Sequence, residues 1–323
     1  MFGFDDLRPI RLIENAKIAC PVKDCKCQFE VQVRPFKRDR KYRCDAHRIF
    51  VGKTTFEYDD LHCNLLWATE ADRRLLERIG QHKRENRLAR ERSEDAVSWN
   101  VFRHLQISGR LDAWVASVLG RPSTPAQVHY WSFDEATGAT WGPLDRARGG
   151  FGELEGRGSE PDLVISTPAA YIWIEAKFGS SNRSSPSDRD GAGGRYTANG
   201  WYAETVSSPF DTIAFPKPDG RARYELLRHW LLGSWAADQN RRRFVLVNLV
   251  RKGREEDVPA FAAQHFKINE RREVQSLTWE SIFEQVSASD VQSADDARLL
   301  AYMRSKTLGY ASSGQLVRAF STT

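Results

Sequence analysis

Three charged residues, Asp162, Glu175 and Lys177, lie within or beside two apolar segments of this 323-residue chain. The segments read PDLVIS and YIWIEAKF, and both have the apolar, β-branched and aromatic composition of buried strands. A charged side chain in a buried strand is costly unless it is paired or binds a metal. The two acids and the lysine are therefore the first candidates for chemistry.

The two segments predict an antiparallel hairpin with its turn at residues 168–169. This turn places Asp162 opposite Glu175, and side-chain alternation puts Lys177 on the same face. The type of turn stays open, because type I turns are not the preferred two-residue hairpin loops. Two carboxylates directly opposite each other repel, at a cost of up to about 1 kcal/mol. A divalent cation would remove this repulsion.

Carboxylate oxygens suit Mg²⁺ or Mn²⁺, so Asp162 and Glu175 are candidate ligands of such an ion. An ammonium group two residues away, on Lys177, can orient a nucleophilic water or neutralise charge that develops on a phosphate. The alternative is a surface hairpin with a local Glu-Lys pair. The apolar character of both strand faces disfavours this alternative, because it predicts a central, covered strand.

The pattern EPDLVI…YIWIEAKF resembles the core of the PD-(D/E)XK nuclease superfamily, which has the restriction-endonuclease-like fold. In that family the Asp and the Glu hold one or two Mg²⁺ ions and the lysine assists the attacking water. The resemblance implies these roles for Asp162, Glu175 and Lys177, and a metal-ligand role for the backbone carbonyl of Ala176. It also implies an α/β fold with an αβα core around a central mixed sheet.

Many members of the superfamily add a glutamate from the helix that precedes the sheet, and SEDAVSWNVFRHL is the matching segment here. One helical stripe of this segment contains Glu94, Val97, Val101 and Leu105. The resemblance therefore implies Glu94 as a fourth site residue, with Asp95 as the less favoured substitute. The alternative is that Ser93 caps the helix and Glu94 only benefits from the helix dipole.

The helix after the motif often supplies an auxiliary polar residue in the superfamily. Tyr224, Glu225, Arg228 and His229 are available here, and none of them stands out in the sequence. His229 is interpreted as a packing or phosphate-contacting residue.

Four of the five cysteines lie within residues 20–44, in the segments CPVKDCKC and YRCDAH. The spacing of Cys20, Cys25, Cys44 and His47 predicts a tetrahedral structural zinc site made by two short loops. Cys27 is an alternative to Cys25 as the second ligand. The region resembles the zinc-ribbon modules found attached to nucleases, and disulfides are disfavoured because no signal peptide is seen.

Eight basic residues lie between residues 34 and 54, interleaved with aromatic residues. This pattern is compatible with phosphate contacts and base stacking, and its alternative is a solvated charged face. The residues predicted to bind nucleic acid are Lys37, Arg38, Arg40, Lys41 and Arg43, together with Arg195 from a long Ser/Gly-rich segment at residues 179–222. The expected partner is double-stranded DNA, and the formal charge of +5 permits such a partner without requiring it.

The sequence predicts a zinc-binding module at residues 1–66, a charged helical connector at 67–92 and a nuclease domain at 93–323, with a mainly helical C-terminal part. No apolar run of membrane-spanning length occurs, so we expect a cytoplasmic protein without a membrane partner.

The function expected from the resemblance is a Mg²⁺- or Mn²⁺-dependent DNA endonuclease with a structural Zn²⁺, acting in restriction or other anti-phage defence. Duplex cleavage by a single-site enzyme is compatible with a homodimer. The alternatives are a nucleic-acid-binding or transposase-type subunit on the same fold, or an RNA nuclease.

Overall fold

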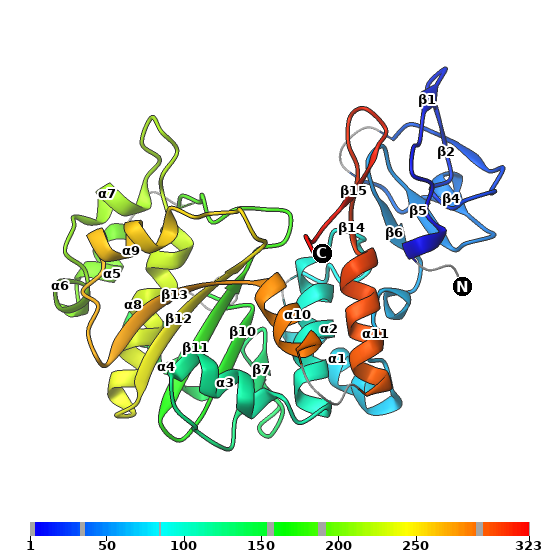
Figure 1. Cartoon of the computed structure of the whole chain (residues 1–323). Coiled ribbons are helices and arrows are strands. Elements are labelled where there is room, and N and C mark those ends of the chain that lie inside the picture. Colours follow the sequence, from blue (N-terminus) through cyan, green and yellow to red (C-terminus); the bar gives the residue numbers. More distant parts are fainter. Residues whose placement is uncertain are drawn as a thin grey trace. The chain divides into compact units, whose positions relative to one another are not determined.

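The computed structural model describes residues 4–32, 36–83, 85–153, 158–186, 192–288 and 293–322. The chain forms two compact units (Figure 1). The first contains residues 1–69, 86–104 and 279–323, and the second contains residues 70–85 and 105–278. This division differs from the boundaries expected at residues 66 and 92, because the C-terminal segment pairs with the N-terminal module. Tyr310 N donates to Thr54 O (2.7 Å), and Leu316 N donates to Pro9 O (2.9 Å).

A five-stranded mixed sheet forms the centre of the second unit, in the order β13-β12-β11-β10-β7. The strands are β7 (Gln127–Tyr130), β10 (Leu163–Ser166), β11 (Ala170–Ala176), β12 (Arg243–Val250) and β13 (Arg272–Thr278). Strands β11, β12 and β13 are parallel, whereas β10 is antiparallel to both β11 and β7. The predicted α/β class with a central mixed sheet is confirmed. Every residue of the central strand β11 is buried, as its apolar sequence predicts.

Strands β10 and β11 form the predicted hairpin, with the predicted register. Leu163 pairs with Ile174, which places the preceding residue Asp162 opposite Glu175. The Thr167 side chain stabilises the connection, because its hydroxyl oxygen accepts hydrogen bonds from Ala169 N (3.2 Å) and Ala170 N (2.9 Å).

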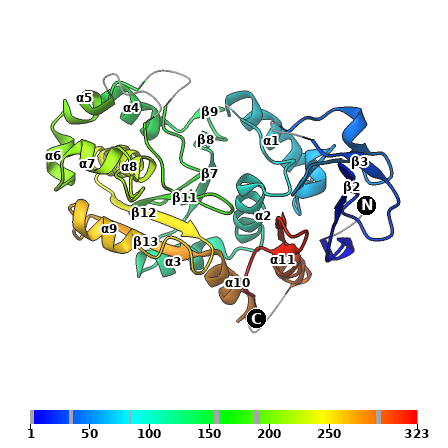
Figure 2. The same ribbon diagram turned by 90° about the horizontal axis from the view of Figure 1, so that it is seen from above.

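Helices lie on both sides of this sheet, as Figure 2 shows for α8 (Tyr224–Gln239) and α3 (Leu111–Leu119). Helix α8 packs against β11 and β12 and also against α4 (Gly142–Gly150). The close approach requires Gly233, since a Cβ at this position would lie 2.2 Å from the ring of Phe244 and 3.0 Å from that of Trp173. Trp173 and Phe244 therefore mark the sheet face that α8 covers.

The remaining elements of the second unit are short or peripheral. They are α1 (Glu70–His82), β8 (Phe133–Asp134), β9 (Ala139–Thr140), α5 (Ala192–Thr197), α6 (Trp201–Thr205), α7 (Phe210–Ala214) and α9 (Val258–His265). The segment 179–222, expected as a long loop, thus contains three short helices. The expectation of a mainly helical C-terminal part missed strand β13, which is half-buried along most of its length.

The first unit contains two small three-stranded sheets, a two-stranded pair, three α-helices and three short 3-10 helices (η) among the described residues. One sheet consists of β1 (Ile13–Glu14), β2 (Lys17–Ala19) and β3 (Gln28–Glu30), and the other of β4 (Arg43–Cys44), β5 (Ile49–Val51) and β6 (Phe56–Tyr58). Its other elements are η1 (Phe4–Asp6), η2 (Arg40–Tyr42), η3 (Leu61–Asn64), most of α2 (Glu94–Ile107), α10 (Trp279–Ser287), α11 (Ala294–Ser305), β14 (Thr307–Tyr310) and β15 (Leu316–Arg318).

Across the described part of the chain, no helix combines the length and the apolar character that crossing a bilayer would need.

Candidate functional site

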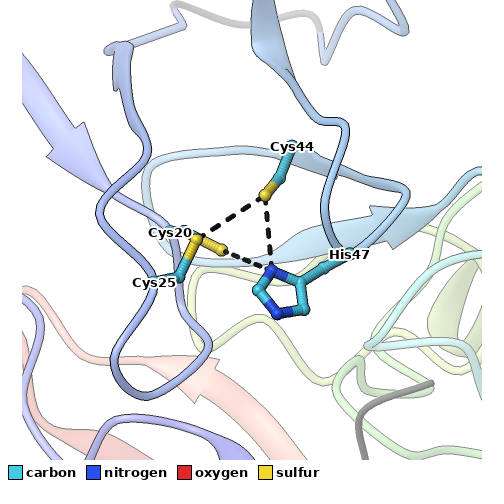
Figure 3. A group of neighbouring side chains, drawn as sticks. All are labelled: Cys20, Cys25, Cys44 and His47. Carbon is cyan, nitrogen blue, oxygen red and sulfur yellow. Dashed lines mark hydrogen bonds between the residues drawn. The ribbon is translucent and has the colours of Figure 1, made fainter.

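Two turns of the first unit bring Cys20, Cys25, Cys44 and His47 together (Figure 3). Cys20 directly follows β2, and Cys44 ends β4. The two loops are closed by backbone hydrogen bonds, from Cys20 N to Cys27 O (2.9 Å) and from Arg48 N to Cys44 O (2.7 Å). The four ligand atoms lie within 4.8 Å of one another. The structure thus selects Cys25, and not Cys27, as the fourth member of the group.

Three of the distances among these four atoms match the edges of a zinc tetrahedron. Cys25 Sγ lies 3.8 Å from Cys44 Sγ, and His47 Nδ1 lies 3.4 Å from Cys44 Sγ and 3.8 Å from Cys20 Sγ. Zinc bonds of about 2.3 Å to sulfur and about 2.0 Å to nitrogen give edges of roughly 3.5–3.8 Å in a tetrahedron. A Cys₃His set with this spacing can bind a metal such as zinc, and it has no open position for catalysis.

Cys27 and Cys63 lie outside this ligand set. Both are half-buried and pack against the small apolar core of the module. The hydrogen bond with Cys25, followed by burial, raises the pKa of Cys27 to about 11.

A second group of charged side chains lies at the carboxyl end of β11. The Lys177 ammonium donates to Glu175 Oε1 and lies 3.4 Å from Glu225 Oε2, and His229 Nδ1 lies 3.1 Å from Glu175 Oε2. Glu175, Lys177 and His229 are buried, whereas the Glu225 side chain is 41% exposed. Each oxygen of Glu175 therefore has a nitrogen neighbour, and Glu225 marks the exposed edge of the group.

Helix α8 positions Glu225 and His229 one turn apart, on the face that packs against β11. Sequence reasoning named both residues without singling them out, and it interpreted His229 as a packing or phosphate-contacting residue. The signal that distinguishes them is their i, i+4 spacing on the otherwise apolar stripe of the helix.

Burial and charge act in opposite directions on Glu175. Burial alone would raise its pKa, but the attraction of Lys177 and His229 outweighs burial and lowers the pKa to about 2. Glu175 is therefore a carboxylate at neutral pH, which is the form that binds a cation.

Asp162 directly precedes β10 and lies opposite Glu175, and its Oδ2 accepts a hydrogen bond of 2.8 Å from Ala176 N. This bond fixes the Asp162 carboxylate beside the backbone of the residue between Glu175 and Lys177. Asp162, Glu175, Ala176 and Lys177 are therefore neighbours in the structure, and their role in a metal site stays a prediction. In the described part of the chain, the Cys₃His set is the one group of three or more Cys, His, Asp or Glu side chains with metal-binding spacing.

A buried polar network braces the elements that carry this group. Asn248 of β12 pairs with Glu175 in the parallel register, and its Oδ1 accepts a 2.6 Å hydrogen bond from Asn182 Nδ2. Asn182 also donates from its backbone N and from Nδ2 to Glu255, at 2.7 Å each. Arg223, just before α8, lies 3.8 Å from Glu255 through Nη1. The loop after Lys177, the loop after β12 and the start of α8 are therefore held together.

Glu94 is half-buried at the start of α2, while Val97, Val101 and Leu105 of its stripe are buried. The Ser93 hydroxyl accepts a hydrogen bond from Ala96 N (3.0 Å), so Ser93 caps this helix. Glu94 belongs to the first unit, whereas Asp162, Glu175 and Lys177 belong to the second. Its role in the site stays a prediction.

Three of the six basic residues predicted to bind nucleic acid have acidic neighbours. Arg38 lies 3.6 Å from Glu57, Lys41 lies 3.6 Å from Glu30, and Arg43 lies 2.7 Å from Asp45. Lys37 and Arg40 are exposed on the same module, and Arg195 is half-buried in α5. The ion pairs reduce the positive field that this face offers a phosphate backbone.

No known protein-family model matches the chain, and no curated protein or solved structure is significantly similar to it.

Proposed function

We propose that this protein is a metal-dependent endonuclease that hydrolyses phosphodiester bonds in DNA, in the restriction or anti-phage role that the PD-(D/E)XK resemblance implies. The single observation that carries the proposal is the placement of Asp162 opposite Glu175, with Lys177 bonded to Glu175, on a central buried strand. Burying charged side chains costs free energy, and a catalytic site that requires these charges explains why they are buried here.

The donor set at this position suits a hard cation. Asp162 and Glu175 would hold Mg²⁺ or Mn²⁺ together with the carbonyl oxygen of Ala176, and the ion would polarise the phosphate and lower the pKa of a bound water. Mg²⁺ keeps several waters and needs few protein ligands, so two carboxylates and a carbonyl are sufficient.

Lys177 is the residue that would act on the attacking water. Its ammonium lies between the carboxylates of Glu175 and Glu225, so it would hold the water near the phosphorus and stabilise the charge that develops there. His229 would keep the Glu175 carboxylate in place, since it contacts the other oxygen. The zinc-binding module would contribute contacts to the phosphate backbone, which position a duplex without reading its sequence.

The test is cleavage of supercoiled plasmid by the purified protein with Mg²⁺ or Mn²⁺, compared with Asp162→Asn, Glu175→Gln and Lys177→Met. Each substitution should reduce the rate by about 100-fold or more, because it removes a group that acts on the reacting phosphate. Glu204→Gln is the matched control, since Glu204 is an exposed acid of the same unit.

Circular dichroism and DNA binding would show that the variants remain folded. Unchanged cleavage by Glu175→Gln or Lys177→Met would contradict the proposal. Binding of DNA without any cleavage by the wild-type protein would favour the alternative of a nucleic-acid-binding subunit.

A further inference from the structure

A small pocket of the second unit lies at the edge of the sheet where β12 and β13 begin. Its volume is ≈ 50 Å³. Its apolar and neutral lining consists of Trp201 from α6, Ser234 and Ala237 from α8, and Phe244 from β12. Trp201 is held in place by a hydrogen bond from its Nε1 to Ser234 Oγ (2.9 Å).

Four arginines complete the lining of this pocket, namely Arg241, Arg242, Arg271 and Arg272. Among the described residues that line it, Asp238 is the one acid, and it lies 3.9 Å from Arg271. The Arg272 guanidinium lies over the Trp201 ring at 5.2 Å, and its Nε is buried without a hydrogen-bond partner among the described residues. The positive charge of the lining is therefore largely uncompensated.

The end of α8 does not account for these arginines. Cations are favoured near a helix C-terminus because the last carbonyls lack partners. Here those carbonyls already have donors, since Asn240 Nδ2 bonds Ala236 O (2.7 Å) and Arg242 N bonds Ala237 O (2.9 Å). Arg241 N likewise bonds Asp238 O (3.0 Å). The helix end is satisfied by backbone and amide groups. The Arg242 guanidinium donates to Thr167 O and lies over the Tyr171 ring, so Arg241, Arg271 and Arg272 are the arginines whose guanidinium groups can bind another acceptor.

This pocket is separate from the candidate nuclease centre. Its strand β12 starts at Arg243, which pairs with Ala170, whereas Glu175 pairs with Asn248 near the other end of the same ladder. Five residues along a strand span roughly 16 Å. The pocket and Glu175 thus lie near opposite ends of the strands β11 and β12.

We propose that the pocket binds a phosphate group. Arginine donates several hydrogen bonds in a planar arrangement that matches phosphate oxygens, and such charge-assisted bonds are strong. One water needs about 10–15 Å³ of such a cavity, so the pocket has room for about three to five water-sized atoms, the size of a phosphate. The phosphate comes either from a nucleic-acid backbone or from a free phosphate compound, and the chemistry of recognition is the same.

The direct test is calorimetric titration of the full-length protein with inorganic phosphate, at low salt and without divalent cations. Arg272→Gln and Arg271→Ala should each weaken phosphate binding by about tenfold, the effect of losing one charge-assisted hydrogen bond. The Arg271 side chain is 76% exposed, so Arg271→Ala should leave the fold intact. This variant therefore still tests the proposal if Arg272→Gln fails to fold. Arg74→Ala is the control, because Arg74 is an exposed arginine of α1 that is absent from the pocket.

A second titration, with duplex DNA over a range of salt concentrations, shows whether the phosphate group comes from a nucleic-acid backbone or from a free phosphate compound. A shallower salt dependence for the pocket variants, by about one unit of slope per arginine removed, means that the pocket takes a backbone phosphate. Weakened phosphate binding with unchanged DNA binding means that it takes a free phosphate compound. Absence of phosphate binding by the wild type, or equal affinity in wild type and variants, overturns the proposal. Because no metal is present, this result is independent of whether the protein cleaves DNA.

Discussion

The Glu175 carboxylate has cationic or polar neighbours at both of its oxygens, Lys177 on one side and His229 on the other. In the proposed nuclease a metal must share or replace one of these contacts. Lys177 has a second carboxylate, that of Glu225, within 3.4 Å. The Lys177 ammonium could therefore stay beside Glu225 if Glu175 bound a metal. This position suits a residue that would hold a water at the site.

His129 provides a prediction that does not depend on the nuclease proposal. Burial lowers its pKa to about 4, with the nearby Asp134 only partly opposing this effect. Its Nε2 lies 3.1 Å from Ser166 Oγ, and its ring packs against Trp141 at 5.2 Å between centroids. The histidine is thus neutral in the fold, whereas an unfolded histidine takes up a proton near pH 6.5.

A group with a lowered folded-state pKa contributes stability above its unfolded pKa and loses it as the pH falls. His129 should therefore lower the free energy of unfolding by roughly 2–3 kcal/mol between pH 7.5 and pH 4.5. Urea unfolding of wild type and His129→Phe at both pH values measures this contribution, since the variant should lose that part of the pH dependence. An equal pH dependence in the two proteins would show that the fold does not lower the pKa of His129.

The strands around the Cys₃His set are too short to be stable alone. Strands β2, β3, β5 and β6 have three residues each and β4 has two, and isolated hairpins of this size are marginal in water. The Cys₃His set joins the loop after β2 to the turn between β4 and β5. Metal binding would thus supply folding energy to both small sheets.

Cys44→Ser should remove the bound zinc and increase amide hydrogen exchange throughout residues 13–58, because both sheets lose their common ligand set. Cys27→Ser should keep the zinc, since Cys27 lies outside the set. Elemental analysis and hydrogen-exchange mass spectrometry measure the two effects. If Cys27→Ser loses zinc and Cys25→Ser keeps it, then Cys27 and not Cys25 is the zinc ligand.

Local patterns were sufficient to predict the elements that carry the candidate site. The turn before Ala170 and the alternation in YIWIEAKF define the β10–β11 register, which the structure confirms. The cysteine and histidine spacing likewise predicted the ligand set, although it left Cys25 and Cys27 as alternatives. Both predictions rest on residues that are close in sequence, and the geometry of tight turns fixes their distances.

Features that depend on distant packing could not be predicted in the same way. Glu225 and His229 follow Glu175 by about fifty residues, and only the packing of α8 against β11 shows that they meet it. Strand β13 reads REVQSLT, whose polar residues do not mark a strand, and it pairs along one side with the apolar strand β12. Its parallel pairing compensates for the weak local pattern.

At the scale of the whole molecule, the first unit is assembled from three separate parts of the chain. Glu91 and Lys306 are fully buried and lie 3.4 Å apart, although one belongs to the middle part and the other to the C-terminal part. Lys306 also lies 3.3 Å from Asn64 Oδ1, and Thr307 donates to Glu91 through its hydroxyl (2.6 Å). Burial lowers the pKa of Lys306 and raises that of Glu91, while their mutual attraction opposes both shifts.

Lys306→Met should lower the free energy of unfolding by about 3–5 kcal/mol, because it leaves the Glu91 charge buried without its partner. The double variant Glu91→Gln/Lys306→Met should lose much less, since it removes both charges. Urea unfolding of the two single variants and the double variant gives the coupling energy. Additive effects of the two substitutions would show that the pair is not coupled.

The discontinuous build of the first unit has a consequence for biosynthesis. A ribosome makes residues 1–104 well before residues 279–323, and all of residues 105–278 emerge in between. The backbone groups of Pro9, Arg11 and Thr54 then lack the C-terminal partners that they bond in the finished protein. The longer segment of the second unit is continuous, so this unit can fold before the first unit is complete. During that interval the N-terminal segment lacks its C-terminal partners, and a chaperone or early zinc binding would then protect it from aggregation.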